Sequence, residues 1–211
     1  MNYTETIRNY LSNHKCELFD LGYEYSCKFG MMDKKTFTRI IGRLEDEGIL
    51  QQVAKGVYYI NGDEGYSDQK IIEYYVNNFH GMIIGSSLFS KLNIRDNEDG
   101  ILDIITNKID SNKTIGKFKF YKVEIPLFDN DIIDIITLLE LFESLREPYD
   151  SNRLLEVVRK CISNYNDSAF ELVIKNTDYK CSTIEKLVGV FSTANKANNM
   201  IKIYKKCGSY E

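Results

Sequence analysis

The sequence predicts an α+β protein in which an N-terminal winged helix-turn-helix precedes a larger α+β domain with a helical C-terminal end. Three patterns support this prediction. Between residues 33 and 60, an amphipathic helix is followed at once by two short runs rich in β-branched and aromatic residues. Residues 116–125 alternate apolar and polar side chains, as a half-exposed strand does. From residue 129 onward, apolar residues recur at helical spacing.

Two helices are expected at the start of the chain, over residues 4–13 and 17–29. Each carries apolar side chains at helical spacing: Ile7, Tyr10 and Leu11 in the first, and Leu18, Leu21 and Tyr25 in the second. In a winged helix-turn-helix, two such helices support a third helix that enters the major groove of DNA.

That third helix is predicted over residues 36–47, with Asp33 as its N-cap and Gly48 as the residue that ends it. Its buried face consists of four apolar residues, Phe37, Ile40, Ile41 and Leu44. Gly42 lies on the opposite face, where it is either a weak point of the helix or a place of close approach to a partner.

A β-hairpin is predicted directly after this helix, with strands over residues 49–54 and 57–60 joined by Lys55-Gly56. Its tip corresponds to the wing, which contacts the DNA backbone in proteins of this class. Tyr58 is expected to pack in the core, or else to reach a phosphate from the wing.

The glycine-rich segment 62–65 predicts a domain boundary, which gives a winged helix-turn-helix domain over residues 1–62 and an α+β domain over residues 66–211. In the second domain we expect strands over residues 101–107 and 116–125, paired through a turn at 110–113. Helices are expected over residues 69–79, 86–92, 129–145, 152–165, 168–176 and 183–204. The acidic side chains between residues 129 and 143 are expected to form a solvated face.

The composition limits the functional classes. The net charge is −4, and residues 1–62 hold eight Lys/Arg and eight Asp/Glu, so DNA contact requires a local basic patch. Five widely spaced cysteines without a CxxC pair indicate reduced thiols in a cytoplasmic protein. The sequence has no apolar run long enough to span a membrane, and it indicates no metal site and no cofactor.

The exposed face of the third helix is cationic at its start. Its acidic residues are confined to its end, at 45–47, which leaves Lys34, Lys35, Arg39 and Arg43 where base edges would be met. Lys55 at the hairpin tip would reach phosphate. A charged face is also what an ordinary solvated helix shows. The alternative is a protein-interaction module that does not bind DNA, in which the winged helix is a docking surface and the acidic second domain binds a basic partner.

The Gly85-Ser86 turn allows an enzymatic interpretation, because it is followed at a distance by Asp96, Asn97, Glu98 and Asp99. Nucleotidyltransferases hold triphosphate on such a turn and magnesium on two carboxylates of one strand. The stretch Asp-Asn-Glu-Asp-Gly has the composition of a turn and could bury neither face of a strand. The chain is therefore expected not to be an enzyme.

The run TFTRIIGRLEDEGILQQVAKGVYYI resembles the N-terminal winged helix of AbiEi-type antitoxins, which belong to type IV toxin–antitoxin systems. GMIIGSSLFSKLNI is similar to a later element of that family, in which Gly85-Ser86 starts a short helix. The resemblance implies an autorepressor that binds double-stranded promoter DNA and counters a cognate nucleotidyltransferase toxin. The implied DNA-binding residues are Lys34, Lys35, Thr36, Thr38, Arg39 and Arg43, with Lys55 on the wing.

Overall fold

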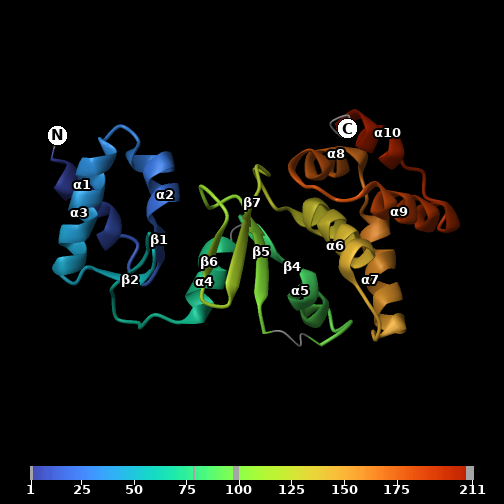
Figure 1. The fold of residues 1–211 in the computed structure, drawn as a ribbon, viewed down its shortest axis with the longest axis horizontal. Coiled ribbons are helices and arrows are strands. Elements are labelled where there is room, and N and C mark those ends of the chain that lie inside the picture. The colour runs from blue at the N-terminus through green and yellow to red at the C-terminus, as the bar shows by residue number, and fades with distance from the viewer. Residues whose placement is uncertain (1, 78, 97–99, 208–211) are drawn as a thin grey trace. The chain divides into compact units, whose positions relative to one another are not determined.

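The computed structural model describes residues 2–77, 79–96 and 100–207 and confirms an α+β fold (Figure 1). The chain divides into two compact units. The first comprises residues 1–77 with residues 108–111, and the second comprises residues 78–107 and 112–211. In the part of the chain that the structure describes, no helix has both the length and the apolar content that crossing a membrane requires.

The first unit contains a small three-stranded antiparallel sheet and its surrounding helices. The sheet order is β1-β3-β2, so the last strand of the predicted hairpin lies in the middle. The elements, in chain order, are α1 (Tyr3–Ser12), β1 (Leu18–Asp20), α2 (Leu21–Glu24), the π-helical η1 (Tyr25–Phe29), α3 (Lys34–Asp46), β2 (Leu50–Ala54), β3 (Val57–Ile60) and α4 (Asp68–Tyr75).

The predicted third helix and hairpin are confirmed. Helix α3 begins two residues earlier than expected, and the Oδ2 atom of its N-cap Asp33 accepts a hydrogen bond of 2.8 Å from the Thr36 amide. Gly48 ends the helix with a φ of +71°, the left-handed conformation that glycine adopts without steric cost. Local sequence signals therefore determine this segment.

The helix predicted over residues 17–29 is confirmed only from Leu21 onward, where α2 and η1 follow each other directly, and it is wrong before that residue. Leu18, Phe19 and Asp20 are all buried and extended as β1, which pairs antiparallel with β3. The Asp20 side chain then caps the short α2 by accepting a hydrogen bond from the Tyr23 amide. Pairing with a strand almost forty residues away thus outweighs the local helical spacing.

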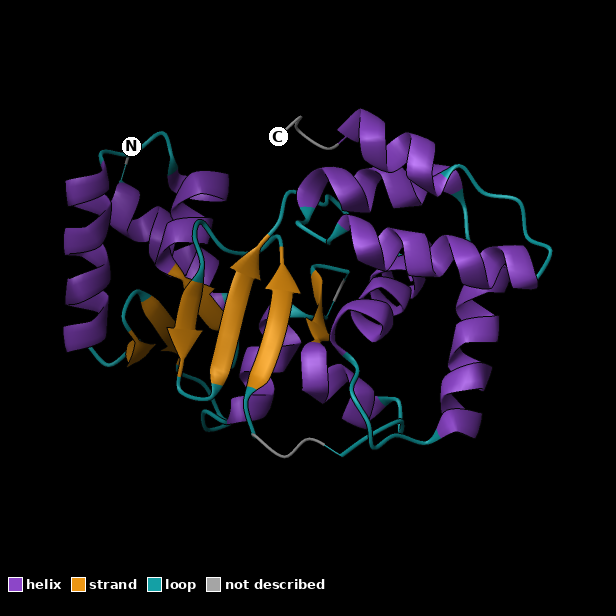
Figure 2. Ribbon diagram, turned by 45° about the vertical axis from the view of Figure 1, so that its right-hand side comes forward, coloured by secondary structure: helices purple, strands orange, loops and turns teal. Residues whose placement is uncertain are grey.

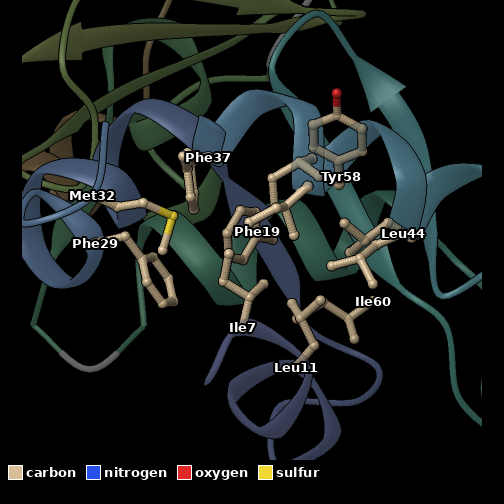
Figure 3. Packing of buried hydrophobic residues seen from close by; sticks show 12 residues of the cluster. Ile7, Leu11, Phe19, Phe29, Met32, Phe37, Leu44, Tyr58 and Ile60 are labelled. Carbon is tan, nitrogen blue, oxygen red and sulfur yellow. The ribbon is translucent and has the colours of Figure 1, made fainter. Parts of the chain in front are cut away.

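A hydrophobic core holds α3 against the other elements of this unit. Ile7 and Leu11 of α1 and Phe19 of β1 belong to one buried cluster with Phe37 of α3 (Figure 3). Phe37 and Ile41 are completely buried, as the sequence predicted for that face. Because this face is fixed, the opposite face of α3 must lie at the surface.

Helix α4 belongs to the first unit, although the sequence placed the boundary before it. Two tyrosines of α4 bind carboxylates of the earlier elements. The Tyr75 hydroxyl donates to Asp20 Oδ2 and the Tyr74 hydroxyl donates to Glu24 Oε1, each at 2.7 Å. The ammonium group of Lys108 lies 3.5 Å from the centre of the Tyr74 ring. These buried polar contacts explain why the unit extends beyond residue 62.

The second unit contains a four-stranded mixed sheet of order β4-β5-β7-β6 (Figure 2). Strands β5 and β7 were expected to pair through a turn, but they run parallel, and β6 forms the antiparallel partner of β7. The elements are β4 (Gly81–Ile84), α5 (Gly85–Lys91), β5 (Leu102–Thr106), β6 (Lys113–Ile115), β7 (Phe118–Lys122), α6 (Asn130–Ser144), α7 (Ser151–Ser163), α8 (Asp167–Asn176), α9 (Cys181–Thr193) and α10 (Met200–Cys207).

The predicted helical C-terminal end is confirmed, with one correction. The expected helix over residues 183–204 is two helices, α9 and α10, separated by a loop. Asp134 and Glu140 of α6 are buried and do not belong to a solvated face. Asn164 donates to Asp134 Oδ2 at 2.7 Å and the Tyr179 hydroxyl donates to Glu140 Oε1 at 2.6 Å, which satisfies both carboxylates inside the protein.

Candidate nucleic-acid interface

The outward face of α3 carries most of the predicted DNA-binding residues. Side chains on its first two turns are exposed: Lys34, Lys35, Thr38 and Arg39. Thr36 is half-buried. The structure therefore exposes four of the six predicted α3 residues on the first two turns, near the helix N-terminus, where the macrodipole adds a partial positive charge.

The turn before α3 is held in place by its own contacts. The Tyr25 hydroxyl of η1 donates to the Met32 carbonyl oxygen at 2.7 Å. The Lys34 ammonium group lies 5.9 Å from the centre of the Tyr25 ring, close enough for a cation–π attraction. Together with the Asp33 cap, these contacts fix the direction in which the N-terminus of α3 is presented.

Gly42 follows Lys35 and Arg39 along the same line of the helix surface. A Cβ atom at this position would meet nothing within 4 Å. No internal packing constraint therefore requires a glycine there, and the backbone of α3 is uncovered at this point.

The C-terminal half of α3 is tied to α1. Arg8 forms an ion pair with Glu47, and the Arg43 Nη2 atom lies 3.5 Å from Thr4 Oγ1. Arg43 is exposed, but its guanidinium group is directed toward α1 and away from the first two turns. Arg43 is thus set apart from the other predicted contacts.

The hairpin between β2 and β3 presents Lys55 as an exposed residue. Gly56 has a φ of +74°, and its carbonyl oxygen accepts a hydrogen bond of 2.9 Å from the Leu21 amide. This bond anchors the tip to α2. Gln51 and Gln52 on β2 are also exposed and can donate and accept hydrogen bonds, although sequence reasoning did not select them.

Tyr58 is a core residue. Its side chain is 8% exposed and belongs to the cluster around α3, so the phosphate contact considered for it is wrong (Figure 3). Burial, followed by the nearby Glu45 carboxylate, raises the pKa of the Tyr58 hydroxyl. The hairpin therefore offers Lys55 and the two glutamines to a ligand.

The Gly85-Ser86 turn begins helix α5, as predicted. Gly85 has a φ of +63°, and its amide donates to Glu140 Oε2 at 3.0 Å. Burial raises the pKa of the Glu140 carboxyl. Residues 97–99 of the candidate carboxylate motif lie outside the described residues. Elsewhere, no group of three or more His, Cys, Asp or Glu side chains among the described residues could hold a metal ion.

Comparison with known proteins adds no family assignment. A search against models of protein families finds no match. A search of curated proteins finds none either.

Proposed function

We propose that this protein is an AbiEi-like antitoxin that acts in the cytoplasm and represses transcription by binding double-stranded promoter DNA. One observation carries the DNA-binding part of the proposal. The first two turns of α3 expose three cations and a hydroxyl, from Lys34, Lys35, Arg39 and Thr38, and the hairpin that follows α3 in the chain exposes Lys55. The order helix, strand, helices, hairpin supports a winged helix-turn-helix.

The chemistry of this surface suits duplex DNA. Lysine and arginine side chains on a helix that enters the major groove can donate to guanine O6 and N7, and Thr38 can bind either type of base. Lys55, which is exposed at the hairpin tip, could neutralise a phosphate. The acidic residues at the end of α3 would repel the DNA backbone, so they restrict contact to the first turns.

The antitoxin part of the proposal rests on the sequence resemblance. In that interpretation, the second unit counters a nucleotidyltransferase-type toxin. The short helix α5 that begins at Gly85-Ser86 supports the resemblance, because the similar element of the family starts a helix at these residues. Coexpression of the protein with a nucleotidyltransferase encoded beside it should restore growth that the enzyme alone arrests.

A gel-shift experiment with the DNA upstream of its own gene tests the DNA-binding part. The wild-type protein should bind in a salt-sensitive manner, and Lys35→Ala/Arg39→Ala should lose about tenfold or more in affinity. The matched control, Lys91→Ala/Lys119→Ala, removes the same charge from exposed positions of the second unit and should bind as the wild type does. Salt-independent binding, or equal affinities of both variants, would overturn the proposal.

A further inference from the structure

The last part of the chain has a charge opposite to that of the region before it. Residues 63–185 hold 14 Lys/Arg and 22 Asp/Glu, whereas residues 186–207 hold five lysines and no Asp or Glu. This segment covers most of α9, the loop that follows it, and α10. The net charge of the whole second domain does not reveal this positively charged segment.

The fold places these lysines at the surface. Leu187 and Phe191 of α9 and Met200 and Ile203 of α10 are buried, so both helices turn their polar residues outward. The intervening loop is held by Asp167, whose carboxylate oxygens accept hydrogen bonds from the amide and side chain of Asn199 at 3.1 and 2.6 Å. The arrangement is thus fixed by contacts within the second unit.

An open hollow of about 700 Å³ lies between these elements. Its lining combines the ammonium groups of Lys196, Lys202 and Lys205 with side-chain amides and the apolar side chains of Val188 and Ile201. This lining, within the described residues, includes neither a carboxylate nor an aromatic ring. Its charge is therefore unbalanced.

The lysines of this segment differ in how they are engaged. Lys206 forms an ion pair with Glu171 at 3.0 Å, and Lys196 donates to the Ser163 carbonyl oxygen at 3.3 Å. Lys202 and Lys205 are exposed, and none of the ion pairs found among residues 2–77, 79–96 and 100–207 involves them. Lys202 and Lys205 can therefore bind an external anion without first breaking an ion pair within the protein.

We propose that this hollow binds an acidic peptide segment of a partner protein. The carboxylates of the peptide would meet Lys196, Lys202 and Lys205, and its apolar side chains would contact Val188 and Ile201. Single-stranded nucleic acid fits less well because its bases need aromatic side chains on which to stack. Duplex DNA presents a convex, polar backbone that would leave the apolar part of the hollow unused.

The test uses the full-length protein and fluorescence anisotropy with three labelled probes. These are a synthetic peptide of alternating Glu and Leu residues, the same peptide with Gln in place of Glu, and a 20-base-pair duplex of random sequence. The variant Lys202→Glu/Lys205→Glu reverses both available cations. The control Lys91→Glu/Lys119→Glu makes the same change in charge at exposed positions outside the hollow.

The Glu peptide should bind the wild type and the control variant with equal affinity. The Gln peptide should bind the wild type at least tenfold more weakly than the Glu peptide does. Lys202→Glu/Lys205→Glu should bind the Glu peptide at least tenfold more weakly than the wild type does. Unchanged circular dichroism of this variant, or the same loss in Lys202→Gln/Lys205→Gln, excludes misfolding as the cause. Absence of Glu-peptide binding, an equal loss in the control variant, or selective loss of duplex binding by Lys202→Glu/Lys205→Glu would overturn the proposal.

Discussion

Replacing Tyr74 by phenylalanine should weaken the first unit by removing one hydroxyl group. This hydroxyl donates to Glu24 Oε1 at 2.7 Å and accepts a hydrogen bond of 3.3 Å from the Asp20 amide. Tyr74 is 7% exposed and Glu24 is 2% exposed, so water cannot easily replace the lost partner. The change therefore affects two buried polar groups at once.

The magnitude follows from these contacts. A hydrogen bond to a charged group contributes about 1.5–3 kcal/mol. Glu24 still accepts a hydrogen bond from the Tyr10 hydroxyl at 3.0 Å and pairs with Lys28 at 3.3 Å, which limits the loss. We expect the free energy of unfolding to fall by about 2 kcal/mol. For a unit of this size, that lowers the melting temperature by roughly 8–16 °C.

Urea unfolding of the full chain, followed by tyrosine fluorescence and circular dichroism, measures the change. Tyr66→Phe is the matched control, because its half-buried ring stacks edge-on against Tyr59. Its hydroxyl has no hydrogen-bond partner among the described residues. It should change stability by less than about 0.5 kcal/mol. Equal effects of Tyr74→Phe and Tyr66→Phe would refute the anchoring of α4 by buried carboxylates.

Three further predictions concern pH and single positions. Burial raises the pKa of Tyr74 and of Tyr75, and a carboxylate raises each further, that of Glu24 for Tyr74 and that of Asp20 for Tyr75. The native state thus keeps protons that the unfolded state loses above pH 10, and stability in urea titrations should fall there by about 1.4 kcal/mol per pH unit for each tyrosine. Gly42→Ala fills open space on a helix and should raise stability by about 1 kcal/mol, whereas Gly42→Leu should keep the fold and weaken DNA binding in a gel shift. Because the pKa of Glu140 is raised by burial, the stability that its protonated form provides is present below pH 4.5 and is lost as the pH rises. The stability of Glu140→Gln minus that of the wild type, measured by urea unfolding, should therefore increase from pH 4 to pH 7, and a constant difference would contradict the effect.

The segment from Asp33 to Ile60 could be predicted because its signals are local. An apolar period, an N-cap, a glycine with positive φ and a two-residue hairpin are all encoded within a few neighbouring residues. The candidate DNA contacts on the first turns of α3 follow from the same helical spacing, because the positions of the buried apolar residues determine which residues lie on the exposed face. Arg43 was grouped with them because helical spacing does not report its contact with Thr4 of α1.

The errors came from interactions between distant residues. Strand β1 depends on pairing with β3, and the parallel pairing of β5 with β7 cannot be read from either strand alone. Helix α4 joins the first unit through tyrosine hydroxyls that bind Asp20 and Glu24, and its sequence does not identify these partners. The lysine-rich segment 186–207 can be recognised in the sequence, but the net charge of residues 63–211 is negative and does not reveal it.

The most direct test of the central claim compares binding to promoter DNA and to a scrambled duplex of equal length, by fluorescence anisotropy over a range of salt concentrations. The wild type should prefer the promoter, and affinity for both should fall with salt. Lys35→Ala/Arg39→Ala should lose most of that preference, whereas Lys55→Ala should weaken both complexes alike and lower the log–log salt slope by about 1. No salt-sensitive binding, or a preference that survives Lys35→Ala/Arg39→Ala, would contradict a DNA-binding role for α3.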